Sequence, residues 1–137
     1  MIPTNIGWKA NGHNVMGNGL AFEAKARFPM VAFLYGEWCQ QHGVNAPIYT
    51  YEPGKLVLFP TKPLDVDNPH LSWKHFSSLA LVRKSAHQLA NWAGETIQVA
   101  LPMVGCGLGC LDPKVVTEEL KKLLPTDNFV LVTSKAR

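Results

Sequence analysis

One stretch, "TIQVALPMVGCGLGCLDPKVV" (residues 96–116), decides the fold, because it runs from an apolar segment through glycines into the start of a helix. The segment "TIQVALP" is short and apolar, as expected of a buried strand. Asp112 and Pro113 have the residue types of an N-cap and a first helical turn, and "KVVTEELKKLL" places Val116, Leu120 and Leu123 on one face. A strand that leads through a loop into a helix is the repeating unit of α/β folds.

The same alternation extends through the rest of the chain. The pattern predicts a strand stub at "MIPTN", two short helices from about Leu20 to about Gln41 divided at Pro29, and a closing strand at "FVLVTS". The runs "PIYTYE" and "KLVLFP" predict a hairpin or a pair of neighbouring strands, with Pro53 and Gly54 supplying the turn dihedrals.

A long helix is predicted over "KHFSSLALVRKSAHQLANWA" (residues 74–93), with Gly94 as its C-terminal cap. Its apolar stripe is expected to comprise Phe76, Leu79, Val82, Ala86, Leu89 and Ala90. Strands alternating with helices favour an α/β fold in which helices cover both faces of a largely parallel sheet.

Composition sets limits on the class of protein. With 137 residues, 47% hydrophobic and 17% charged, we expect a single domain over residues 1–137 with its own core. The net charge of +3 favours an anionic ligand without requiring one. No segment has the pattern of a signal peptide or a membrane span, and the cysteine count is odd, so a cytoplasmic location is expected.

Two glycine-rich loops are candidate ligand sites. In "NVMGNGLA" and "GCGLGC" the missing side chains would let a phosphate approach backbone amides near the start of a helix. Neither loop has the Gly-Lys-Ser/Thr ending of a P-loop. A tight turn explains one such loop equally well, whereas two in one small domain favour a diphosphate ligand.

An ordered set of motifs resembles the macrodomain family, whose members bind ADP-ribose. The motifs are "IPTN", "NVMGNGLA" followed by "RFP", "LFPTK", "LSWK" and "ALPMVGCGLGCLD", which together span Ile2 to about Val132. Within that family they are most similar to the branch of the terminal ADP-ribose glycohydrolase and the antitoxin macrodomains that remove ADP-ribose from thymidine in DNA. The resemblance implies a three-layer α/β/α fold with a mixed, largely parallel sheet, and a bacterial or phage origin.

The resemblance also implies site residues. Lys62 would be the catalytic group, because the lysine after the central strand has this role in the glycohydrolase branch. A lysine acts as a nucleophile when burial or nearby positive charge lowers its pKa. The ligand-binding residues would be Asn5, Val15, Met16, Gly17, Gly19, Leu20, Val104, Gly105, Cys106, Gly107, Leu108, Gly109, Cys110 and Leu111.

Two departures from the family pattern carry expectations of their own. Gly109 stands where the human glycohydrolase has an aspartate, which favours the DNA-type branch. Family members usually have strands before "PTN", so we expect either that the natural chain starts upstream of Met1 or that the sheet is reduced, with a first strand that is exposed or paired with another chain. Adenine would then contact an aromatic residue such as Phe129 or Tyr35.

The predicted function is removal of ADP-ribose from a modified DNA or protein target, a reversal of ADP-ribosylation with a role in DNA repair. The alternative is a non-catalytic reader, or a binder of free ADP-ribose derivatives; a degraded domain that binds nothing also stays open. No cofactor is expected, and the cysteine spacing does not favour a metal site. The cluster "NPHLSWKH", with Trp73 and Lys74, is either an exposed helix entry whose tryptophan packs on the core or a site of DNA contact beside Lys62, and each residue alone favours the helix entry.

Overall fold

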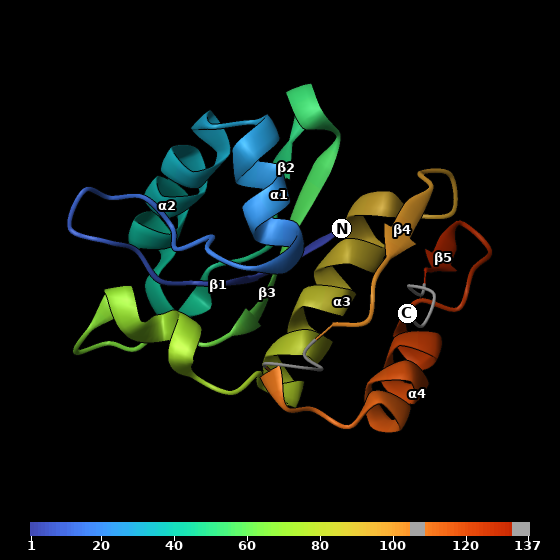
Figure 1. The fold of residues 1–137 in the computed structure, drawn as a ribbon. Coiled ribbons are helices and arrows are strands. Elements are labelled where there is room, and N and C mark those ends of the chain that lie inside the picture. The colour runs from blue at the N-terminus through green and yellow to red at the C-terminus, as the bar shows by residue number, and fades with distance from the viewer. Residues whose placement is uncertain (105–108, 133–137) are drawn as a thin grey trace, which may run out of the picture.

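A computed structural model describes residues 1–104 and 109–132. Two helical layers enclose the strands, as Figure 1 shows. Helices α1 (Gly19–Arg27) and α2 (Met30–His42) form one layer, and α3 (Leu79–Ala93) and α4 (Pro113–Leu123) form the other. The predicted α/β architecture with helices on both faces is confirmed.

The strands form two ladders. β1 (Ile2–Asn5) pairs in parallel with β3 (Leu56–Lys62), and β2 (Tyr49–Tyr51) pairs antiparallel on the other side of β3. β4 (Val99–Leu101) and β5 (Phe129–Leu131) form a separate parallel pair. The α-amino group of Met1 donates a hydrogen bond to the carbonyl of Ala100 over 2.9 Å, which joins the two ladders. The arrangement is therefore mixed and largely parallel, as predicted.

Strand β3 is buried on both faces, which explains the continuous apolar run in its sequence. Val57 and Phe59 belong to the core cluster under α3 and α4, whereas Leu58 belongs to the cluster under α1 and α2. Successive side chains of a strand point to opposite faces, so a strand buried on both faces has no polar alternation. β3 is thus the central element between the two cores.

Local signals set most helix ends correctly. Asp112 caps α4, since its carboxylate accepts a hydrogen bond from the Lys114 amide over 2.9 Å. Gly94 ends α3 at a positive φ of 55°, and its amide donates to the carbonyl of Ala90. Each cap has the residue type that its position requires, which is why the sequence predicted these ends.

The start of the long helix was predicted wrongly. α3 begins at Leu79, because the hydroxyl of Ser78 accepts a hydrogen bond from the Leu81 amide and caps the helix there. Phe76 lies before the helix and is 71% exposed, so it is no part of the apolar stripe. The segment before α3 contains a 3₁₀ helix, η3 (Pro69–Lys74).

The hairpin turn also differs in one dihedral. Lys55, not Gly54, has the left-handed conformation, with φ of 51°. A Cβ on Gly54 would lie 2.8 Å from the Phe28 ring, so that glycine makes room for a neighbour instead of accepting an unusual φ. The predicted antiparallel hairpin itself is confirmed.

The side chains of strand β1 are not exposed, as we had expected them to be: those of Ile2, Thr4 and Asn5 are all buried. The backbone of β1 pairs with β3 along one side, and Met1 donates a hydrogen bond to Ala100 of β4 on the other. The exposed strand is β5, where Val130 is 53% exposed. β1 is the end strand of its ladder, so self-association through its backbone edge stays a prediction.

Candidate functional site

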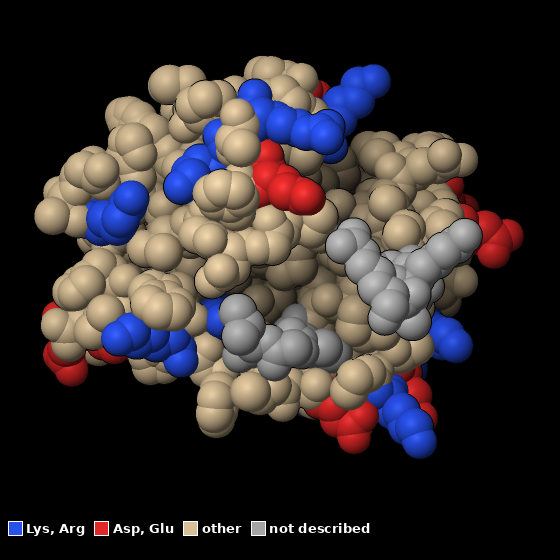
Figure 2. All heavy atoms as spheres, viewed as in Figure 1, with Lys and Arg blue, Asp and Glu red and all other residues tan. Residues whose placement is uncertain are grey.

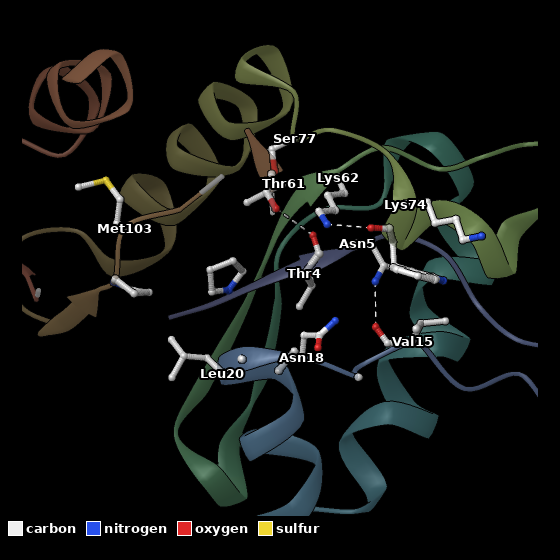
Figure 3. Close-up of a pocket in the computed structure, with 17 residues that line it drawn as sticks. Thr4, Asn5, Val15, Asn18, Leu20, Thr61, Lys62, Lys74, Ser77 and Met103 are labelled. Atoms are coloured by element: carbon white, nitrogen blue, oxygen red, sulfur yellow. Dashed lines mark hydrogen bonds between the residues drawn. The ribbon is translucent and has the colours of Figure 1, made fainter. Parts of the chain in front are cut away.

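A cavity of about 780 Å³ opens where three strands end. Asn5 ends β1, Lys62 ends β3 and Pro102 follows β4, and all three residues line the cavity (Figure 3). Its volume lies within the range of about 300–1,000 Å³ that is typical of small-molecule sites. In open α/β sheets ligands bind at the carboxyl ends of the strands, so the position agrees with the fold.

One wall is built on two buried asparagines. Asn14 donates from its carboxamide to the carbonyl of Asn5 over 2.9 Å and to the carbonyl of Gly7 over 2.8 Å. Asn5 in turn donates to the carbonyl of Val15 over 2.8 Å, as the dashed line in Figure 3 marks. These bonds fix the 15–20 loop against the end of β1, and so give the cavity a preformed wall.

The N-terminus of α1 faces the cavity without a side-chain cap. Gly19, Leu20 and Ala21 form the first turn of the helix and line the cavity, and the side chain of Asn18 makes no capping hydrogen bond. First-turn amides have no partner within the helix, and the helix dipole favours an anion beside them. α4 differs, because Asp112 already occupies its N-terminus. The α1 end is therefore the better phosphate site.

Lys62 is a positioned amine in this cavity. Its Nζ atom donates a hydrogen bond to the carbonyl of Trp73 over 2.8 Å (Figure 3). Burial lowers the pKa of the Lys62 amine, and the nearby Cys110 opposes that shift. A lowered pKa increases the fraction of neutral, nucleophilic amine at a given pH.

The segment that carries Trp73 is tied to the scaffold. The hydroxyl of Ser72 donates to the Pro69 carbonyl over 2.8 Å and accepts from the Asp65 amide over 2.9 Å. His75 Nε2 lies 3.1 Å from Asp65 Oδ2, which closes the same loop at its other end. The hydrogen bond to His75 lowers the pKa of Asp65. The carbonyl that holds Lys62 is thus anchored by its own segment.

Gly109 is a glycine because Ser77 occupies the space beside it. A Cβ at Gly109 would lie 2.2 Å from the Ser77 hydroxyl oxygen and 3.0 Å from its Cβ. The Ser77 amide donates to the Gly109 carbonyl over 3.0 Å, so the two backbones are held together. The aspartate of the glycohydrolase pattern therefore does not fit at this position unless the Ser77 side chain moves.

Several comparisons identify the fold. The sequence matches no protein-family model and no curated protein. The structure is similar to the macrodomain of Mycobacterium tuberculosis DarG, with a TM-score of 0.73 and 26% identity, over 98% of this chain and 86% of that chain. The chain has the macrodomain fold.

Two further structures agree. The macrodomain of Thermus aquaticus DarG has a TM-score of 0.72 and 24% identity, over 98% of this chain and 87% of that one. Thermosipho africanus DarTG in complex with ADP-ribose has a TM-score of 0.71 and 23% identity, over 99% of this chain and 38% of that one. Among macrodomains, the chain is thus similar to those of DarG.

The macrodomain cavity is lined by seven of the fifteen residues that we predicted for the site, and four of the other eight lie outside the described residues. The seven residues are Asn5, Val15, Gly17, Gly19, Leu20, Lys62 and Gly109. A Cβ on Gly17 would meet no atom within 4 Å, so its missing side chain leaves open space. Which of these seven residues bind a ligand stays a prediction.

The other predicted residues lie elsewhere. The side chains of Met16 and Val104 are buried in the two cores, and Leu111 packs against the core that contains Val104. Cys110 is exposed and does not line the cavity. Gly105, Cys106, Gly107 and Leu108 lie outside the described residues.

Sequence reasoning missed part of the wall. Thr4, Thr61, Ser77 and Met103 line the cavity. The Ser77 hydroxyl is buried without a hydrogen-bond partner among the described residues, so it is available to a ligand. Two serines, Ser77 and Ser78, precede α3, and a serine at this place predicts an N-cap. The sequence does not show that Ser78 caps the helix and that Ser77 faces the cavity, because this depends on the residue at which the helix begins.

Other candidate groups do not contribute. Tyr35 is fully buried and shares a hydrogen bond with Thr4, so it is not the adenine contact that we considered. Burial raises the pKa of the Cys39 thiol to about 12, which leaves it protonated and unreactive. Among the described residues, no group of three His, Cys, Asp or Glu side chains could hold a metal ion. No helix in the described part of the chain is long and apolar enough to cross a membrane.

Proposed function

We propose that this cavity binds ADP-ribose and that the chain hydrolyses the glycosidic bond between ADP-ribose and a modified target, with Lys62 as the catalytic residue. The observation that carries the proposal is the Lys62 amine at the end of β3, in the same cavity as the uncapped N-terminus of α1. One group suits the anomeric carbon of a ribose, and the other suits a phosphate.

Charge supports an anionic ligand. Lys62 and Lys74 both line the cavity, and no carboxylate does so among the described residues. On the face drawn in Figure 2 the lysine and arginine side chains are spread around a central hollow instead of forming one stripe. The face therefore has no continuous basic stripe along which a long duplex backbone would lie, and the two cavity lysines favour a compact anion such as a diphosphate.

In the proposed reaction the neutral Lys62 amine attacks the anomeric carbon of the distal ribose. A bond forms between Nζ and that carbon, and the bond to the acceptor breaks, so the acceptor leaves with the electron pair. Water then displaces the lysine and releases ADP-ribose. The lowered pKa of Lys62 supports the first step, because only the deprotonated amine is a nucleophile.

The lining favours acceptors that leave without help from an acid. Lys62 and Lys74 are the only titratable side chains that line the described cavity, so no carboxylic acid is placed to protonate the leaving atom. A group that is stable as an anion, such as the imide of thymine or the carboxylate of an ester, needs no such acid. This limits the target to DNA bases of that kind or to acidic side chains.

One observation favours the alternative of a reader. The Lys62 Nζ atom donates to the Trp73 carbonyl, which is the contact that a protonated ammonium group prefers. A lysine that stays protonated would neutralise a phosphate without reacting. The relation to Thermosipho africanus DarTG, solved in complex with ADP-ribose, supports binding under either alternative.

Calorimetric titration with ADP-ribose tests the proposal at its first step. We expect saturable binding with one site per chain, and weaker binding of AMP, which lacks the second phosphate and the distal ribose. Absence of heat with ADP-ribose at millimolar concentration would exclude both the hydrolase and the reader.

A further inference from the structure

A run of four exposed residues, Trp73 to Phe76, borders the cavity without a role in either core. Phe76 is 71% exposed and Trp73 is 40% exposed, while the serines on both sides of the run are buried. Large aromatic side chains are expensive to leave in water, and an exposed pair beside a ligand cavity indicates a binding surface. We call residues 73–76 the aromatic rim.

The aromatic rim is held rigidly although it contributes nothing to the cores. Ser72 anchors its first end through the Pro69 carbonyl and the Asp65 amide. At the other end the amides of Ser77 and Ser78 donate to the carbonyls of Gly109 and Thr61, over 3.0 and 2.9 Å. A rigid backbone reduces the entropy that binding costs, so the rings are presented in advance to a partner.

The charges of the rim indicate what the partner is. Lys74 Nζ lies 5.4 Å from the centre of the Trp73 ring, and Lys74 also lines the cavity. The nearby carboxylate, Asp65, is already engaged by His75 and by two backbone amides. Exposed rings next to uncompensated lysines match an unpaired nucleic-acid strand, which offers flat bases to the rings and phosphates to the lysines.

We propose that the aromatic rim is a stacking site for unpaired bases of a single-stranded nucleic acid, and that it presents the strand to the cavity. This deepens the proposed function, on which it rests for the position of the ADP-ribose. The rim also links the bound nucleic acid to the reacting amine, because the backbone carbonyl of Trp73 accepts the hydrogen bond from Lys62 Nζ. A base that stacks on the Trp73 ring would therefore bind next to the group that positions Lys62.

Fluorescence anisotropy with a short labelled oligothymidylate tests the inference without any ADP-ribose. Phe76→Ser should weaken binding by about ten- to a hundredfold, since stacking on one aromatic ring contributes on that order. Trp92→Ser is the control, because Trp92 is another exposed aromatic residue, at 40%, but lies near the other end of α3. The same titration with oligouridylate compares RNA with DNA. Oligothymidylate paired with its complementary strand should bind more weakly than either single strand.

ADP-ribose titration of the same proteins separates this inference from the proposed function. Phe76 does not line the cavity, so Phe76→Ser should bind free ADP-ribose as the unaltered chain does. Unaltered oligonucleotide affinity in Phe76→Ser, or an equal loss in Trp92→Ser, would overturn the inference. A chain that binds oligonucleotides through Phe76 but fails to bind ADP-ribose would instead overturn the proposed function and leave the stacking site in place.

Discussion

The inner wall of the cavity and its aromatic rim differ in what their side chains do for the fold. On the inner wall Asn5 and Asn14 are 6% and 1% exposed, and their carboxamides make hydrogen bonds within the chain. On the rim Phe76 is 71% exposed and packs in neither core. Side chains of the wall shape the cavity, whereas the Phe76 ring of the rim is exposed to a partner. Changes to the wall should therefore affect stability, and changes to the rim should affect binding.

Among changes to the cavity wall and the rim, the largest expected loss of stability comes from Asn14→Ala. The substitution leaves the carbonyls of Asn5 and Gly7 without their donors in a buried site, which should cost about 2–4 kcal/mol in total. Chemical denaturation measures the free energy of unfolding. Asn11→Ala, in the exposed part of the same loop, is the control and should cost less than about 1 kcal/mol. Equal losses in the two variants would show that the wall does not depend on the Asn14 bonds.

A pair of glycine substitutions sharpens the comparison within the cavity. Gly109→Asp should lower the free energy of unfolding by about 1–3 kcal/mol, because its Cβ would overlap the Ser77 hydroxyl. Gly17→Asp should leave stability nearly unchanged, since a Cβ there meets no atom within 4 Å. It should nevertheless weaken ADP-ribose binding through repulsion between its carboxylate and the diphosphate. A stable Gly109→Asp protein would contradict the packing reason given for that glycine.

The pH dependence of turnover reports on Lys62. Its pKa is lowered from 10.5 by burial, so the neutral amine forms at a lower pH than in an ordinary lysine. Single-turnover rates should therefore rise with pH and level off at a midpoint below 10.5. A rate that falls as the pH rises would indicate that the charged ammonium is the active form, and the nucleophilic step would be wrong.

The smallest expected effect on stability is that of Phe76→Ser. A substitution outside both cores should change the free energy of unfolding by no more than about 0.5 kcal/mol. Phe59→Ala, in the buried centre of β3, should by contrast cost about 3–5 kcal/mol. Thermal unfolding of both variants and of the unaltered chain measures these changes in stability. A marked loss in Phe76→Ser would mean that the ring packs on the chain after all.

Local sequence signals predicted most of the fold. Caps at Asp112 and Gly94 and the doubly buried run of β3 each depend on neighbouring residues, so a single sequence suffices to place them. Phe76 was assigned to the helical stripe because its spacing to Leu79 fits one face. The N-cap at Ser78 overrides that spacing, because the residues before a cap are not helical.

The site was less predictable, since it depends on contacts between distant residues. Periodicity does not show that Met16 faces the core while Val15 and Gly17 face the cavity, because an irregular loop has no fixed repeat. The contact between Ser77 and Gly109 joins segments 32 positions apart in the chain, and only the folded structure reveals it. Lys62 was found because it follows a strand in a motif that resembles a family.

Release of ADP-ribose by Lys62→Ala tests the central claim most directly. Single-turnover hydrolysis should be measured on ADP-ribosylated DNA and on a peptide ADP-ribosylated at glutamate, with ADP-ribose affinity measured on the same preparation. We predict that Lys62→Ala loses turnover by at least about a hundredfold and binds ADP-ribose within about tenfold of the unaltered chain, which is about 1.4 kcal/mol. Full turnover in Lys62→Ala, or no turnover of either substrate by the unaltered chain, would contradict the claim that Lys62 is a catalytic residue.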